Sequence, residues 1–226
     1  ACAPELEITR EKMNAAVSER TRMVAVTQVS NVLGCVNDIP ELVKRARACG
    51  AAILMDAAQS APHMPIDVQK LDVDFVAFSG HKMLAPMGIG VLYGKQELLE
   101  KMPPFLTGGE MIETVSRYDA VYAELPHKFE AGTVNAGGAV GLAAAIDYLE
   151  SYGMDKLHAV EQELTAYLFR GMKAIPHIHV LGSDREDNHT GIVSFAVDQV
   201  HPHDISEVLS SDGMDIRAGH HCAQPL

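Results

Sequence analysis

Two side chains of this sequence, a primary amine and a carboxylate, are spaced in a way that could support chemistry. Lys82 ends the run Ser79-Gly80-His81-Lys82, and Asp56, 26 positions earlier (82 minus 56), closes the apolar stretch 52–55. An amine and an acid that both follow buried strands come to the same edge of a parallel sheet. That pairing suits pyridoxal 5'-phosphate (PLP), which is tethered through its aldehyde and held protonated at its pyridine nitrogen. The pair by itself also fits α/β proteins in which the two residues are ordinary loop and capping groups.

The segments around this pair read as strands alternating with a helix. A β-rich run covers 23–29, Pro40 opens a helix that Gly50 ends, and 52–55 and 75–78 are short apolar runs. Continuous apolar runs are typical of strands covered on both faces, and strand, helix, strand forms a βαβ unit. In such sheets a ligand lies beyond the carboxyl ends of the strands. The polar residues predicted at those ends are Asn31, Asp56, Gln59, Ser79, His81 and Lys82.

The hydrophobic pattern restarts near residue 149, which predicts a second α/β unit. Before that point the pattern predicts a helix over 9–18, a strand over 91–93, a helix over 96–101, an extended arm or hairpin over 110–135 and a small-residue helix over 136–152. After it the pattern predicts a helix over 156–172, strands over 178–181 and 191–197, a helix over 203–210 and a short strand over 214–217. We therefore expect two units, residues 1–148 and 149–226.

Composition and charge argue against several classes of protein. The 226 residues hold 18 Lys and Arg against 30 Asp and Glu, and the formal net charge of -12 argues against a nucleic-acid partner. No apolar run of about 18 residues is present, so we expect a soluble protein with no membrane partner. The four cysteines have neither metal-ligand spacing nor the density of a secreted disulfide framework, which favours a reducing cytoplasm. These cysteines are Cys2, Cys35, Cys49 and Cys222.

Cys222 is the candidate nucleophile among the cysteines. It follows Arg217, His220 and His221 on a glycine-containing loop, and cationic neighbours favour the thiolate, which is the reactive form. A lone cysteine is otherwise more often an inert, small hydrophobic residue. A zinc site built from Cys222 and nearby histidines is the other alternative, but adjacent histidines are poor ligands for one tetrahedral ion, and no paired ligand spacing is present. We therefore predict no metal site.

Five segments of the sequence stand in a characteristic order and spacing. They are Val29-Ser30-Asn31-Val32-Leu33-Gly34, Met55-Asp56-Ala57-Ala58-Gln59, Ser79-Gly80-His81-Lys82, Phe129-Glu130-Ala131-Gly132-Thr133 and Arg217-Ala218-Gly219-His220-His221-Cys222-Ala223-Gln224-Pro225. Together they resemble the cysteine desulfurases of the class V aminotransferase family, over essentially the whole chain. The short loop before Cys222 resembles the type II branch, which includes the selenocysteine lyases. The resemblance implies an α/β fold of the fold type I PLP-dependent transferases, with a mostly parallel sheet, helices on both faces and a smaller C-terminal α/β domain.

The resemblance implies PLP as the cofactor and a role for each residue that would hold it. Lys82 would form the imine with the cofactor and, once released, would move the proton at the substrate Cα. Asp56 would hold the pyridine nitrogen protonated, and Gln59 would donate to the phenolic oxygen. Ser79 and His81 would bind the phosphate, to which hydroxyl and imidazole donors are suited.

The resemblance also implies residues for the substrate, the nucleophile and a second subunit. Asn31 and Arg217 would lie near the substrate L-cysteine, and Cys222 would take its sulfur as a persulfide, leaving L-alanine. Thr133 would reach the phosphate of the opposite subunit's cofactor, which implies a homodimer. The sulfur would then pass to an acceptor protein for iron–sulfur cluster assembly.

Other functions stay open, because the sequence departs from the family pattern. The alternatives are a selenocysteine lyase acting on L-selenocysteine, a class V aminotransferase, or a truncated domain without catalysis. A glycine- and threonine-rich loop and a ring-stacking histidine are missing upstream of Asp56, as is an arginine beyond the carboxyl end. Val134, Ala85 and Met87 replace the family's usual proline, glycine and threonine. Because the sequence starts at Ala1 and its candidate nucleophile lies close to its end, we expect a fragment with both domains incomplete.

Overall fold

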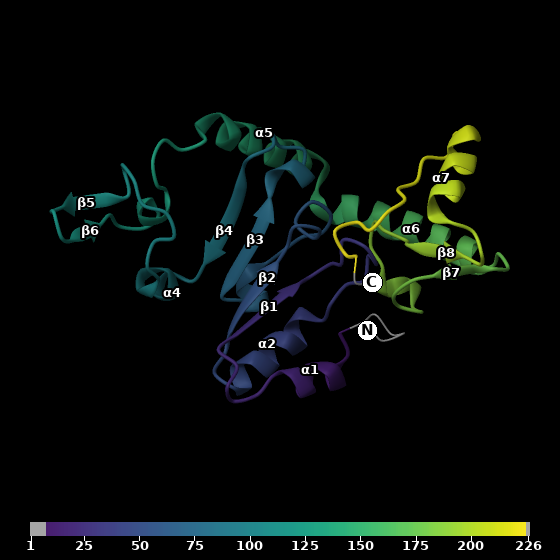
Figure 1. Ribbon diagram of the computed structural model, residues 1–226, viewed down its shortest axis with the longest axis horizontal. Helices are drawn as coiled ribbons and strands as arrows, with labels where there is room; N and C mark the ends of the chain where they lie inside the picture. Colours follow the sequence, from purple (N-terminus) through teal and green to yellow (C-terminus); the bar gives the residue numbers. More distant parts are fainter. Residues whose placement is uncertain (1–7, 225–226) are drawn as a thin grey trace.

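The fold is described from a computed structural model, which describes residues 8–224 (Figure 1). Cys2 and the last residue of the C-terminal motif, Pro225, lie outside the described residues. Figure 1 shows a central sheet with a small hairpin at one end of the molecule and a smaller α/β unit at the other. Among the helices of residues 8–224, none is long and apolar enough to cross a bilayer.

The central sheet is mostly parallel, as the sequence predicts. Its four strands follow chain order, with β1, β2 and β3 parallel and β4 antiparallel to β3. Each strand overlaps a segment that was predicted as a strand, and the helix between β1 and β2 completes the expected βαβ unit. The strands are β1 (Met23–Thr27), β2 (Ala52–Asp56), β3 (Phe75–Ser79) and β4 (Gly90–Gly94).

Helices α1 (Arg10–Ala16) and α2 (Ile39–Ala48) pack together against the sheet (Figure 1). The side chain of Asp38 accepts a hydrogen bond from an N–H of the first turn of α2, and proline follows inside that turn, so this helix begins where the sequence predicts. The buried core joins α1 and α2 to β2 and β3 through residues including Met13, Leu42, Ala46, Ile53, Met55 and Val76. Burial of the strand side chains Ile53, Met55 and Val76 fixes the strand register, since a shift of one residue would turn each of them to the opposite face of the sheet.

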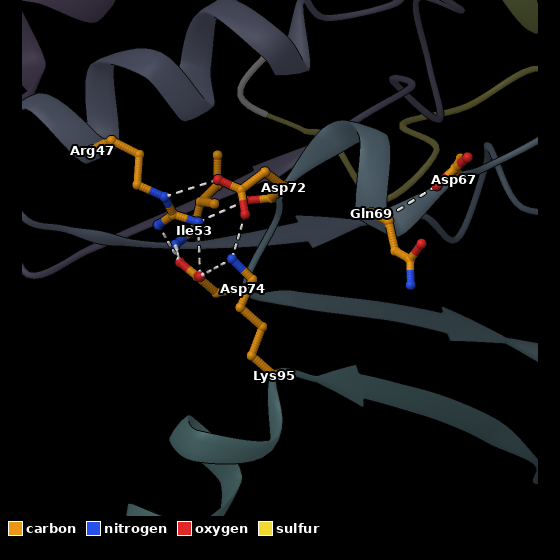
Figure 2. A network of polar contacts seen from close by, with 7 residues as sticks. All are labelled: Arg47, Ile53, Asp67, Gln69, Asp72, Asp74 and Lys95. Carbon is orange, nitrogen blue, oxygen red and sulfur yellow. Dashed lines mark hydrogen bonds and ion pairs between the residues drawn. The ribbon is translucent and has the colours of Figure 1, made fainter.

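A network of charged groups ties the amino-terminal side of the sheet together (Figure 2). Asp74, just before β3, receives two hydrogen bonds of 2.7 and 2.8 Å from the Arg47 guanidinium on α2. Its carboxylate also accepts the Ile53 N–H of β2 at 2.8 Å and lies 3.3 Å from the Lys95 ammonium that follows β4. A short helix, α3 (Val68–Leu71), leads into this network and was not predicted from the sequence.

The predicted arm over 110–135 is a two-stranded antiparallel hairpin that extends from one end of the molecule (Figure 1). It follows α4 (Gln96–Lys101) and consists of β5 (Ile112–Val115) and β6 (Ala120–Tyr122). A short 3-10 turn, η2 (His127–Phe129), then leads towards α5 (Ala136–Tyr152). Gly153, with a φ of 86°, separates α5 from α6 (Met154–Lys173), and residue 149 therefore lies inside a helix.

The smaller unit contains a two-stranded antiparallel sheet, β7 (Ile178–Val180) with β8 (Phe195–Val197), and the helix α7 (Pro202–Ser211). The prediction of a strand over 214–217 is wrong, because the described backbone has no strand there. Instead the Met214 N–H bonds to the Leu209 carbonyl, and the Ile216 carbonyl accepts from the Ser206 hydroxyl. The segment is therefore held by α7 and has no strand partner.

Candidate active site

Three parallel strands end at one edge of the sheet, and the candidate residues follow those ends. Thr27 of β1 pairs with Asp56 of β2, and Asp56 pairs with Ala77 of β3, so Asp56 occupies the middle of the edge. Ser79 ends β3, and Lys82 lies in the 3-10 turn η1 (Gly80–Lys82) that follows at once. The amine and the carboxylate therefore come from adjacent strands at the same carboxyl edge, which is where ligands bind in open α/β sheets.

The side chains of Lys82 and Asp56 make few hydrogen bonds with the residues that the structure describes, so both can bind an external group. The Asp56 carboxylate is exposed and accepts one hydrogen bond, 2.9 Å long, from the Ala58 N–H. The Lys82 side chain is half-buried and makes no hydrogen bond or ion pair with any of residues 8–224. An amine with no carboxylate partner and a carboxylate with a free oxygen form a suitable pair of contacts for a cofactor with both an aldehyde and a ring nitrogen.

Three further polar side chains at this edge are also free of partners among the residues that the structure describes. Gln59 and Ser79 are half-buried and His81 is exposed. In the part of the chain that the structure describes, none of these three side chains hydrogen-bonds to protein. An amide, a hydroxyl and an imidazole are donors that suit a phosphate and a phenolic oxygen. Together with Lys82 and Asp56, these side chains therefore provide functional groups that fit PLP.

The loop that carries Lys82 is braced by the start of α5. The Asn135 side chain donates a hydrogen bond of 3.1 Å to the Gly88 carbonyl and accepts one of 2.9 Å from the Gly138 N–H. One turn later, Gly141 lies so close to Pro86 that a Cβ there would approach the proline ring to 2.6 Å. Asn135 was not predicted from the sequence, although an Asn before a helix of small residues is a recognised capping signal.

The loop of residues 219–223, here called the nucleophile loop, lies beside the end of β1. The Asn31 side-chain amide donates a hydrogen bond of 2.8 Å to the carbonyl oxygen of His221. The Cys222 side chain is exposed and forms no disulfide. A short loop connects Cys222 to Arg217, whose side chain is also exposed. The structure therefore links the predicted nucleophile to a residue at the sheet edge.

Thr133 is exposed and lies in the segment between η2 and α5, two positions before Asn135. Its predicted contact is with a second subunit, so it stays a prediction. Cys35 and Cys49 both form hydrogen bonds inside the protein. The Cys35 sulfur accepts the Ser183 N–H at 3.2 Å, and the Cys49 thiol lies 3.1 Å from a carbonyl oxygen of α2. Within the described part of the chain, no group of three or more His, Cys, Asp or Glu side chains is arranged to hold a metal.

Known proteins match this chain over nearly its whole length. The family model "Aminotransferase class-V" matches residues 2–226. The chain belongs to this class V aminotransferase family. A relative from Streptomyces coelicolor named "Probable cysteine desulfurase" is 50% identical over 214 residues, which are 95% of this chain and 51% of the relative. A relative of the same name from Halalkalibacterium halodurans is 51% identical over 96% of this chain and 52% of its own length.

Solved structures of class V aminotransferase relatives share the fold. An apo cysteine desulfurase from Thermococcus onnurineus is 40% identical, with a TM-score of 0.91 over 98% of this chain and 55% of its own. The Escherichia coli cysteine desulfurase CsdA is 38% identical, with a TM-score of 0.85 over 95% of this chain and 53% of its own. A lysine-to-alanine mutant of C-DES with glycine covalently linked to its PLP cofactor is 26% identical, with a TM-score of 0.82 over 97% of this chain and 57% of its own. The chain spans about half the length of the curated relatives it matches.

Proposed function

We propose that this class V aminotransferase chain acts as, or forms part of, a PLP-dependent cysteine desulfurase. The enzyme would convert L-cysteine to L-alanine, leave the sulfur on Cys222 as a persulfide and pass it to an acceptor protein for iron–sulfur cluster assembly. The observation that carries the proposal is the convergence of Lys82 and Asp56 on one sheet edge, both open to an outside group. Relatives that are about half identical bear the name cysteine desulfurase, which supports the choice of reaction.

The edge residues would divide the binding of PLP between them. Asp56 would accept a hydrogen bond from the ring nitrogen and keep it protonated, and Gln59 would donate to the phenolic oxygen. Ser79 and His81 would donate to the phosphate. When bound, PLP supplies an electron sink for the bonds at the substrate Cα. Lys82 would tether the cofactor and, when released, would take and return the proton at that Cα.

Cys222 would perform the sulfur transfer. Its thiolate would attack the substrate sulfur, so that a sulfur–sulfur bond forms as the carbon–sulfur bond breaks and the electron pair remains with the carbon product. Asn31 would lie near the substrate carboxylate, and Arg217 would lie near the substrate and the nucleophile loop. Because Cys222 is exposed, a persulfide there could be reached by an acceptor protein.

Several finer features belong to the same proposal. We place the enzyme in the cytoplasm as a homodimer, with Thr133 contributing to the cofactor site of the opposite subunit. The exposed position of Thr133 is compatible with such a contact. We also keep the division into a cofactor unit, residues 1–148, and a smaller unit, residues 149–226. Preference for L-selenocysteine over L-cysteine is the second candidate, and it uses the same residues.

Two measurements test the proposed function. PLP added to the protein should give the absorption band of a lysine imine, distinct from that of free PLP, and Lys82→Ala should remove this band because it takes away the amine that forms the imine. Alanine released from L-cysteine should then be lost in Cys222→Ala and kept in Cys49→Ala, which removes a thiol remote from the edge. Absence of a lysine-dependent band would rule out a competent cofactor site. Unchanged release of alanine in Cys222→Ala would contradict the role of Cys222, whereas a 2-oxo acid formed from L-cysteine in place of alanine would favour an aminotransferase.

A further inference from the structure

The nucleophile loop contacts one turn that follows β1, residues 30–35, here called the Asn31 turn. The hydrogen bond from the Asn31 amide to the His221 carbonyl joins residues 190 positions apart. On the other side of Cys222, the side chain of Ala223 packs against the buried apolar cluster of the Asn31 turn. One polar and one apolar contact therefore hold the loop on both sides of the cysteine.

The backbone of the nucleophile loop needs such support. His221 and Cys222 have φ values of 50° and 60°, so two successive residues with side chains occupy the left-handed region. Residues other than glycine rarely adopt this conformation, and it persists where surrounding contacts enforce it. Within the loop, the Ala223 N–H bonds to the His220 carbonyl at 2.7 Å and closes a turn around the cysteine. The contact from Asn31 anchors this turn to the rest of the protein.

The Asn31 turn is itself held firmly from behind. The Ser30 hydroxyl accepts the Leu33 N–H at 3.1 Å, and the Val32 carbonyl accepts a hydrogen bond from the Ser194 hydroxyl. Cys35 forms a β-bridge with His189, which is fully buried. The smaller unit therefore clamps the turn from which the Asn31 side chain projects, and a clamped turn gives its side chain a defined direction.

We infer that Asn31 is a positioning residue for Cys222, acting through the His221 carbonyl. Its side-chain N–H group holds the nucleophile loop at the carboxyl edge of the sheet, where Lys82 and Asp56 also lie. This role is separate from contact with the substrate carboxylate, which the family resemblance suggests for the same residue. The inference rests on the proposed function only in taking Cys222 as the nucleophile.

Hydrogen exchange of the Ala223 amide, followed by NMR in the whole chain, tests the inference. Asn31→Asp keeps the size of the side chain but replaces the donor with a carboxylate. We expect exchange at Ala223 to become about two- to tenfold faster, the effect of losing one ordinary hydrogen bond. Asn37→Asp is the matched control, because the Asn37 amide donates a bond of the same length, 2.8 Å, to the Thr27 carbonyl close by. Equal exchange in Asn31→Asp and the wild type, or an equal increase in Asn37→Asp, would overturn the inference.

A second measurement separates positioning from substrate binding. In the PLP-loaded protein, Asn31→Asp should slow persulfide formation on Cys222 even at saturating L-cysteine, where any change in KM no longer affects the rate. A higher KM at an unchanged saturating rate, together with unchanged exchange, would mean that Asn31 contacts only substrate. Failure of the wild type to form any persulfide would contradict the proposed function, whereas the exchange result would still decide the position of the loop.

Discussion

The Arg47 guanidinium and the Asp74 carboxylate meet through two hydrogen bonds, of 2.7 and 2.8 Å, at the side of the sheet opposite the candidate site (Figure 2). Only 6% of the Asp74 side chain is exposed, whereas 35% of Arg47 is exposed. The carboxylate also accepts the Ile53 N–H, so a single buried acid joins α2, β2 and the start of β3. Such a group is costly to leave unpaired and costly to remove, because its partners lose their bonds.

Asp74→Ala should lower the free energy of unfolding by about 3 kcal/mol, because it leaves the Ile53 N–H without its acceptor and leaves the Arg47 guanidinium only its contacts with Asp72. Urea unfolding followed by circular dichroism measures the loss. The matched control is Asp184→Ala, which removes the acid of an exposed pair with Lys173, and no measurable change is expected there. Equal losses in the two variants would contradict the importance assigned to the buried network.

Stability should also fall in acid through this network. The Lys95 ammonium holds the pKa of Asp72 below its usual range. Burial alone would raise the pKa of Asp74, but hydrogen bonds from Arg47 and the Ile53 N–H outweigh burial and lower it. A carboxyl whose pKa is lower in the folded state stabilises the fold above its unfolded pKa, near 4, and loses that contribution as pH falls through the folded value.

Urea midpoints measured from pH 6 down to pH 3 check this expectation. The wild type should lose stability below about pH 4, and Asp74→Asn should lose less over the same interval because one of the coupled carboxyls is gone. Some acid dependence should remain in the variant, since Asp72 still titrates against Lys95. A variant with the same acid slope as the wild type would show that Asp74 does not contribute.

Gly34→Ala should disrupt the Asn31 turn. Gly34 has a φ of 65°, and a Cβ there would collide with the Ile192 carbonyl oxygen of the smaller unit. Gly50 has a similar φ, 69°, but its Cβ would meet no atom within 4 Å. We expect Gly50→Ala to cost about 1 kcal/mol for the left-handed backbone and Gly34→Ala at least about 3 kcal/mol, because overpacking adds to it. Similar urea midpoints for the two variants would show that the close approach has no energetic effect.

Gly141→Ala should destabilise the contact between α5 and the loop after Lys82. The new Cβ would lie 2.6 Å from the Pro86 ring, and forcing such a contact costs about 1–3 kcal/mol. Gly137, in the same helix, has open space around its Cα, so Gly137→Ala should instead gain about 0.5–1 kcal/mol from helix propensity. Thermal melting of both variants distinguishes these opposite signs, and a stabilising Gly141→Ala would contradict the packing.

The strands of the sheet and the residues at their ends could be predicted from the order of the amino acids. Short apolar runs bounded by polar residues place Asp56 and Lys82 beyond β2 and β3, because a parallel βαβ unit brings successive carboxyl ends to one edge. The family segments, read in order, identified the class V aminotransferase fold for the same reason: local sequence sets each strand and turn.

Contacts between groups that are distant in the sequence could not be predicted, because they depend on how the whole chain packs. Examples are the antiparallel pairing of β4 with β3, the Arg47–Asp74 pair and the contact of Asn31 with His221. In each of them the local sequence of one segment contains no information about the other. The wrong prediction of a strand over 214–217 has the same origin, because a strand exists only where a neighbour accepts its hydrogen bonds. A local pattern specifies what a segment can form, and packing against the rest of the chain selects what it does form.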